Sequence, residues 1–146
     1  MTTIHLRANT TVTPEQFVGA LVDFGPGRSE LFGNSADRDL VVHDKGVDHA
    51  DVTEGSGGVW ERLTYDWSDR HHVVLTTTDS NVWGGTSGHA YRLTPRADGT
   101  TDIDYTVVRE GKNLRARVFA ALFATVGKGV LTKAFQNSVR AIEKRR

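Results

Sequence analysis

The sequence predicts an α+β fold in which a seven-stranded antiparallel sheet curves around one long C-terminal helix. Three observations support this prediction. Residues 112–146 contain no proline and carry apolar residues at helical spacing. Most of the preceding chain alternates apolar and polar residues in short runs, as half-buried strands do. Short turn sequences separate these runs, which is typical of hairpins, and a sheet with one apolar face needs a helix to cover it.

The N-terminal part is predicted to form one strand and two short helices. Residues 4–12 place their apolar side chains on one parity, which indicates a half-buried strand. The sequence from Thr13 to Gln16 has the pattern of a capping box with proline at the first helical position. We therefore expect a helix to about Phe24 and, after a Gly-Pro-Gly break, one or two further turns over residues 28–32.

Six more strands are expected after these helices. Each run combines β-branched or aromatic residues with a period of two, and glycine-rich or Asp-Gly turns separate the runs. The expected strands span residues 40–43, 47–54, 59–67, 72–79, 89–94 and 103–107. With the first strand these make seven, and the length fits one domain over residues 1–146.

The C-terminal helix carries two apolar stripes that cannot both face one sheet if the helix is straight. At about 100° per residue, the stripe within residues 118–130 lies nearly opposite the stripe within residues 131–142. Gly127 and Gly129 lie where the stripe changes side, and each glycine weakens a helix by about 1 kcal/mol relative to alanine. We expect a kink or break there, or burial of one stripe, for example residues 118–126, in a homodimer.

Charge is unevenly distributed along a chain whose formal net charge is zero. From Lys112 onward nine Lys or Arg and one acid give +8, and residues 1–111, with nine bases and 17 acids, give −8. We interpret the basic segment as a solvated face. We therefore expect no binding to nucleic acid or anionic vesicles near physiological salt, with an anionic partner as the alternative.

Cysteine content and apolar run length bound the compartment and the chemistry. The chain has no cysteine, which excludes disulfides and thiol catalysis and fits a reducing compartment. No signal peptide is expected at the N-terminus. The longest apolar run is about nine residues, far below the roughly 20 that a spanning helix needs. We expect a cytoplasmic protein without membrane insertion.

The chain resembles the START-like helix-grip superfamily, also called SRPBCC, which includes polyketide cyclases/dehydrases and lipid-transport proteins. Three segments and the order of the elements carry the resemblance: Thr13 to Phe17, Leu63 to Asp66, and the hairpin from Leu93 to Thr100. The first segment is also similar to small actinobacterial members. The resemblance implies a cavity between sheet and helix that holds lipids, steroids, polyketides or plant hormones, in proteins that include enzymes and simple binders.

Polar residues on the inward parity of the strands are the candidate site. Burying Glu61 or His89 among apolar residues is costly unless the side chain is paired, so we consider both as candidate site residues. We expect a cavity of a few hundred Å³, with Trp83 and the first helices near its mouth. The expected ligand-binding residues are Glu61, Leu63, Tyr65, Trp83, His89, Tyr91, Tyr105, Phe119 and Phe123.

Three functions remain open from the sequence. The first is binding of a small hydrophobic or aromatic ligand, lipid-, polyketide- or steroid-like. The second is a polyketide aromatase/cyclase or dehydratase in which His89, Glu61 and Tyr105 act as acid–base groups. The third is an interaction module that uses the basic C-terminal helix.

The same polar residues also have a purely structural interpretation. In it, Glu61 sits near the mouth, His89 is hydrogen-bonded in the wall, and the tyrosines pack the core. No metal site and no cofactor are expected, because His43 and His49 lack ligand spacing and adjacent His71 and His72 diverge on a strand.

Overall fold

The computed structural model describes residues 1–145 and confirms the α+β fold. The end of the expected helix at Arg146 lies outside the described residues. The elements in chain order are β1 (Thr2–Thr10), α1 (Pro14–Leu21), α2 (Arg28–Leu31), the 3-10 helix η1 (Asp37–Asp39), β2 (Val41–Lys45), β3 (His49–Ser56), β4 (Val59–Asp69), β5 (His72–Ser80), β6 (Gly88–Pro95), β7 (Thr101–Arg109) and α3 (Leu114–Arg145).

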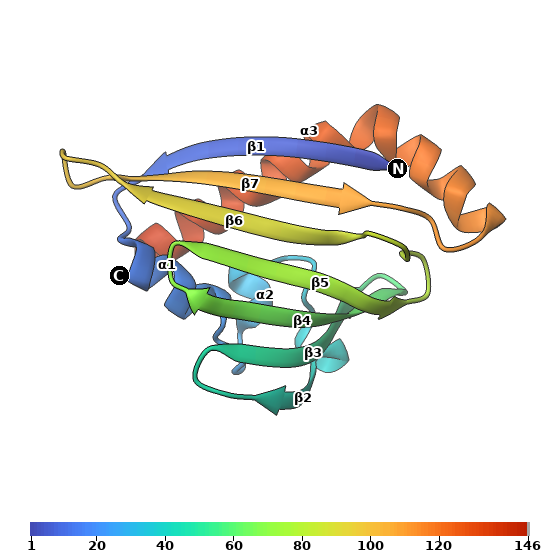
Figure 1. Cartoon of the computed structure of the whole chain (residues 1–146), viewed down its shortest axis with the longest axis horizontal. Helices are drawn as coiled ribbons and strands as arrows, with labels where there is room; N and C mark the ends of the chain where they lie inside the picture. The colour runs from blue at the N-terminus through green and yellow to red at the C-terminus, as the bar shows by residue number, and fades with distance from the viewer. Residues whose placement is uncertain (146) are drawn as a thin grey trace.

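The seven strands form one antiparallel sheet in the order β1-β7-β6-β5-β4-β3-β2. Strands β2 to β7 make a meander, and β1 pairs with β7 residue for residue, from Thr2 opposite Arg109 to Thr10 opposite Thr101. Figure 1 shows α1, α2 and α3 on the same face of this sheet. The hydrophobic core therefore lies between that face and the helices, and it includes Phe17 of α1 and Phe135 of α3.

The start of α1 is as predicted, but its end is not. The Thr13 hydroxyl accepts a hydrogen bond from the Gln16 amide (3.2 Å), and the Gln16 side chain accepts one from the Thr13 amide (3.0 Å). The helix stops at Leu21 instead of about Phe24. The Asp23 carboxylate accepts a hydrogen bond from the Gly25 amide (2.9 Å), and this local turn competes with continued helix.

Strand ends also differ from the expected ones by a few residues. Strand β1 spans Thr2–Thr10 and not residues 4–12, because it ends where its partner β7 begins, at Thr101. Val12 lies after the end of β1 but is nevertheless buried, so its place in the alternating pattern reflects burial in the core and not membership of the strand. The 3-10 helix Asp37–Asp39 was not predicted.

Helix α3 is hydrogen-bonded without a break from Leu114 to Arg145, yet it is bent. In Figure 1 its ribbon rises from its start, turns near its middle and then descends behind the sheet toward the C-terminus. This agrees with the expected kink in the region of Gly127 and Gly129. A Cβ on Gly127 would lie 2.9 Å from the Phe123 ring, so glycine there lets the ring fold back against the helix.

The two stripes of α3 have different surroundings. Phe135, Val139 and Ile142 are buried in the core. Within residues 114–130, which we call the arm, Phe119 and Phe123 turn toward the sheet side while most other large apolar residues face solvent. Val118, Leu122, Val126 and Val130 are between 59% and 64% exposed. The first stripe is thus not buried on the same face as the second.

Candidate functional site

A cavity of about 200 Å³ lies between the sheet and the helices. Its lining includes all nine residues predicted for the ligand site: Glu61, Leu63, Tyr65, Trp83, His89, Tyr91, Tyr105, Phe119 and Phe123. They come from β4, β6, β7, the segment after β5 and the arm. For the residues on β4, β6 and β7, strand parity therefore selected side chains that share one interior space, and the role of all nine residues in binding stays a prediction.

A buried ion pair between Glu61 and Arg109 forms one polar end of this cavity. Arg109 donates from Nη1 to Glu61 Oε2 (3.0 Å) and from Nη2 to Glu61 Oε1 (3.1 Å), and the Thr77 hydroxyl donates to Oε2 (2.9 Å). Burial alone raises the pKa of the Glu61 carboxyl. The charge of Arg109 and its two hydrogen bonds outweigh burial and hold the pKa of Glu61 well below its usual range, so the carboxylate is ionised.

His89 lies between this ion pair and Tyr105. Its Nε2 is 3.0 Å from Arg109 Nη2 and 3.4 Å from Glu61 Oε1, while its Nδ1 is 2.6 Å from the Tyr105 hydroxyl. A guanidinium can only donate, so the shorter Arg109 contact assigns the lone pair to Nε2 and the proton to Nδ1. Burial and the charge of Arg109 lower the pKa of His89, which keeps the imidazole neutral.

The Tyr105 hydroxyl is the polar group best placed to serve a ligand. In the assigned tautomer it accepts a hydrogen bond from His89 Nδ1. It also hydrogen-bonds the Tyr91 hydroxyl, a contact that adds to burial in raising the pKa of Tyr91 and opposes the effect of burial on the pKa of Tyr105, as expected when Tyr91 donates. With both neighbours donating to it, Tyr105 keeps its own proton for a ligand. Burial raises the pKa of Tyr105 to about 12, so the hydroxyl stays protonated. Its ring stacks on Tyr91 with centroids 4.3 Å apart and contacts Phe135 of α3, so its position is fixed from both sides.

A second buried ion pair, Arg28 with Glu54, also lines the cavity. Arg28 Nε donates to Glu54 Oε1 (2.8 Å) and Nη2 donates to the Tyr65 hydroxyl (3.1 Å). The Tyr65 hydroxyl and the Ser35 hydroxyl both donate to Glu54. Burial lowers the pKa of Arg28, but its interactions with Tyr65 and Glu54 more than offset this and raise it.

Two buried carboxylates lie next to each other in the sheet, and each is paired with its own arginine. Glu54 of β3 and Glu61 of β4 are register partners, and both side chains are buried. Like charges placed directly opposite each other destabilise a sheet. Arg28, from α2, neutralises one carboxylate, and Arg109, from β7, neutralises the other.

Trp83 closes the cavity toward the arm. Its ring lies 5.7 Å from the rings of both Phe119 and Phe123, and the Arg109 guanidinium lies 4.9 Å over it. The segment carrying Trp83 is held by an isolated bridge to Gly111, just before the arm begins. The arm thus supplies one wall of the site through two phenylalanines.

Sequence reasoning missed Arg28, Glu54 and Arg109. Parity could have found two of them, because Glu54 shares the inward parity of Val52 and Arg109 shares that of Tyr105. No comparable pattern marks Arg28, which lies in a four-residue helix.

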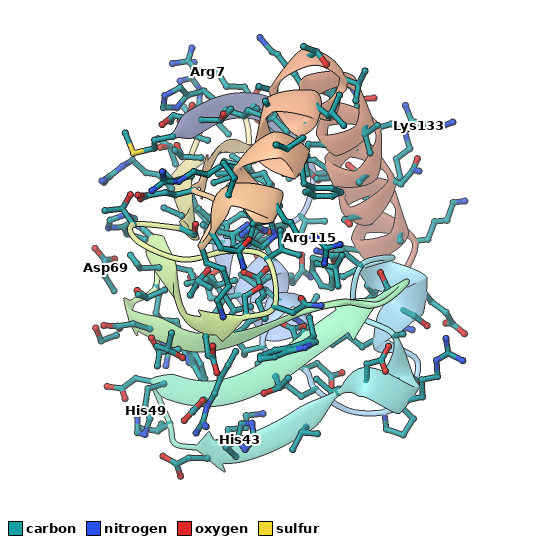
Figure 2. All side chains as sticks on the ribbon, turned by 90° about the vertical axis from the view of Figure 1, so that its right-hand side faces the viewer. Arg7, His43, His49, Asp69, Arg115 and Lys133 are labelled. Carbon is teal, nitrogen blue, oxygen red and sulfur yellow. The ribbon has the colours of Figure 1, made fainter. Side chains whose placement is uncertain are left out.

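The expectation that there is no metal site stays a prediction. Within residues 1–145 no group of three or more His, Asp or Glu side chains could hold a metal ion. His43 and His49 lie on the neighbouring strands β2 and β3, at one end of the sheet order (Figure 2). Each is engaged by a nearby polar side chain, His43 by Thr53 (2.7 Å) and His49 by Asp48 (3.1 Å).

Comparison with known proteins supports the fold by shape and not by sequence. No family model and no curated protein matches the chain. A START superfamily protein from Mycobacterium smegmatis superposes with a TM-score of 0.69 at 8% identity, over 98% of this chain and 95% of that one. The Zhui aromatase/cyclase from a Streptomyces species gives 0.65 at 11% identity, over 99% and 96%. The Aha1 dimer from Colwellia psychrerythraea gives 0.62 at 15% identity, over 98% and 97%.

These similarities extend over almost the whole of each chain, and their low identities bear on fold alone. They agree with the seven-stranded antiparallel sheet and the long C-terminal helix described above. The chain therefore has the START-like helix-grip fold.

Proposed function

We propose that the protein binds a small hydrophobic or aromatic ligand in the cavity between the sheet and α3, in the cytoplasm. One observation carries the proposal: an interior space of about 200 Å³ lined by aromatic rings, with buried polar groups converging on it. An apolar cavity of about 150 Å³ is large enough for benzene, so this space suits a compound of one or two rings. The START-like and aromatase/cyclase neighbours support the same class of function.

A neutral, environment-sensitive naphthyl ketone dye tests this proposal. We expect its fluorescence to report binding at about one dye per folded protein. Tyr105→Trp should weaken the affinity at least about tenfold, because the larger ring occupies the space beside Tyr91. Val42→Trp adds the same ring at an exposed position of β2 and should leave binding unchanged. Circular dichroism checks that both variants fold, and equal affinity in all three proteins contradicts the proposal.

The aromatase/cyclase or dehydratase function has one observation in its favour, the 2.6 Å contact of Tyr105 with His89. That contact makes Tyr105 a good hydrogen-bond donor to a carbonyl. A general base must also lie within reach of the proton it removes. Here His89 Nε2 faces Arg109, and both oxygens of Glu61 are engaged by the same guanidinium. The geometry therefore supports binding better than acid–base catalysis, with Tyr105 as the residue that polarises a ligand oxygen.

A further inference from the structure

The charged groups around the cavity are balanced pair by pair. Glu54 is neutralised by Arg28 and Glu61 by Arg109, and all four side chains are buried. His89 is neutral for the reasons given above. Within residues 1–145 no buried side-chain nitrogen or oxygen lacks a hydrogen-bond partner. The wall thus offers no unpaired charge.

This balance restricts what the cavity accepts. Both terminal nitrogens of Arg109 already donate to Glu61, and Nη2 also contacts His89. A ligand carboxylate or phosphate would have to be buried without a counter-charge, which is very unfavourable. An uncharged oxygen needs only one donor, and the Tyr105 hydroxyl supplies it.

We propose that the cavity selects uncharged ligands of one or two rings that carry a carbonyl or phenolic oxygen, and that it excludes carboxylates and phosphates, including free fatty acids. This inference rests on the binding function proposed above. It adds that the ligand is uncharged. It also assigns to Glu61 the preference for uncharged ligands, because Glu61 neutralises Arg109.

Displacement of the naphthyl ketone dye by two matched competitors tests the inference at pH 7. 2-Acetylnaphthalene and 2-naphthoate have the same rings and nearly the same shape, but only the second is charged. We expect the ketone to compete at least about a hundredfold better than the carboxylate. Equal or stronger competition by naphthoate overturns the inference while leaving the binding function intact. Failure of the dye itself to bind overturns both.

Glu61→Gln gives a sharper test, because it keeps the shape of the wall and frees the charge of Arg109. The preference for the ketone over naphthoate should shrink at least about tenfold. Glu30→Gln removes a carboxylate from an exposed pair with Arg145 (3.0 Å) and should leave the preference unchanged. If Glu61→Gln does not fold, Tyr105→Phe replaces it: ketone affinity should fall roughly two- to tenfold, with naphthoate unaffected. An unchanged ketone affinity contradicts the assigned donor.

A second, independent observation concerns the arm. The most apolar 18-residue stretch of α3 is only 11% buried, unlike a core helix. Its solvent side presents Val118, Leu122, Val126 and Val130, and Leu114 extends the same face. Phe135 and its neighbours are fixed in the core, so within the described part of α3 it is the arm that can meet another surface.

Charge identifies the kind of surface. The arm carries Arg115, Arg117 and Lys128, and no acid occurs from Lys112 to Ile142. Arg115 lies on the apolar side of the helical wheel, and Figure 2 shows this residue on the arm. In a symmetric dimer through this face, Arg115 would be buried against a second arm that offers no carboxylate to pair with it. At a lipid surface, arginine keeps its apolar stem in contact with the membrane and its charge among anionic head groups.

We infer that the arm docks, without spanning, on an anionic lipid surface. By length and composition alone the whole of α3 could cross a membrane, contrary to the expectation from apolar run length. Its second half is packed in the core, however, and the arm alone is about 25 Å long at 1.5 Å per residue, shorter than the roughly 30 Å hydrocarbon thickness. This proposal takes up the alternative of an anionic partner for the basic segment, in place of a solvated face.

Vesicle co-sedimentation tests the docking. The protein should pellet with equimolar phosphatidylcholine and phosphatidylglycerol, less with phosphatidylcholine alone, and less at high salt. Val118→Ser/Leu122→Ser/Val126→Ser should lower binding at least about a hundredfold. Val41→Ser/Val42→Ser, two exposed apolar residues on β2, should not change it. No binding to anionic vesicles overturns the inference, as does a dimer in ultracentrifugation that the triple variant separates.

Discussion

Replacing Arg109 by methionine should lower the free energy of unfolding by about 3–5 kcal/mol. The substitution keeps much of the side-chain volume but leaves the Glu61 carboxylate buried, with Thr77 as its remaining close donor. A carboxylate opposite Glu54 and without its guanidinium is an uncompensated charge in a largely apolar interior. Urea unfolding at pH 7, followed by circular dichroism, measures the loss.

Two further variants show whether the loss comes from the stranded charge. Arg109→Met combined with Glu61→Gln removes both charges and should recover a large part of the stability. Arg62→Met breaks the pair between Arg62 and Asp51 (2.8 Å), in which the arginine side chain is 43% exposed. This variant should lose far less stability than Arg109→Met. If Arg109→Met costs no more than Arg62→Met, the buried pair does not hold the site together as we describe.

Replacing Arg28 by methionine should have an effect of similar size, about 3–5 kcal/mol. Arg28 is 3% exposed, donates to Glu54, and also donates to the Asp23 carbonyl (2.8 Å). Its guanidinium lies 4.7 Å from the ring of Phe24 and 4.8 Å from that of Phe32, so it joins both ends of the α2 segment. The variant therefore loses a counter-charge and the contacts that attach α2 to the sheet.

Arg28→Lys separates charge from shape in the same unfolding assay. Lysine keeps the positive charge, but it has no planar group to stack between two rings and no fork to reach Glu54 and Tyr65 together. We expect it to recover less than half of the loss. Full recovery would show that only the charge at this position matters.

The alternation of side chains along a β-strand explains how much of the site could be predicted from the sequence. In a strand, every second side chain shares a face, so the position of Leu63 or Val107 in the core also fixes where Glu61 and Tyr105 point. This is why residues from three strands meet in one cavity. The fold followed from the same parity, together with turn sequences. The assignment of residues 1–146 to one START-like domain stays a prediction.

The pairings inside the site could not be predicted in the same way. Arg109 reaches Glu61 across 48 positions of sequence, and two strands, β5 and β6, separate β7 from β4 in the sheet. Their contact depends on the curvature of the whole sheet, which no local pattern encodes. Arg28 lies after a Gly-Pro-Gly break in a helix too short to show periodicity. The helical wheel of α3 showed that its two apolar stripes lie on different sides of the helix. It gave no information on which stripe would be buried in the core.

The unequal burial of α3 has a consequence for how fast a ligand enters and leaves. Amide protons near Phe135 and Val139 should exchange with solvent only when the whole protein unfolds, because those residues are locked in the core. The arm has few buried contacts and two glycines at its inner end, so it should open in a smaller and more frequent event. Phe119 and Phe123 leave the cavity in that event. The residence time of a ligand is then governed by local opening of the arm, and a variant can change the release rate without changing global stability.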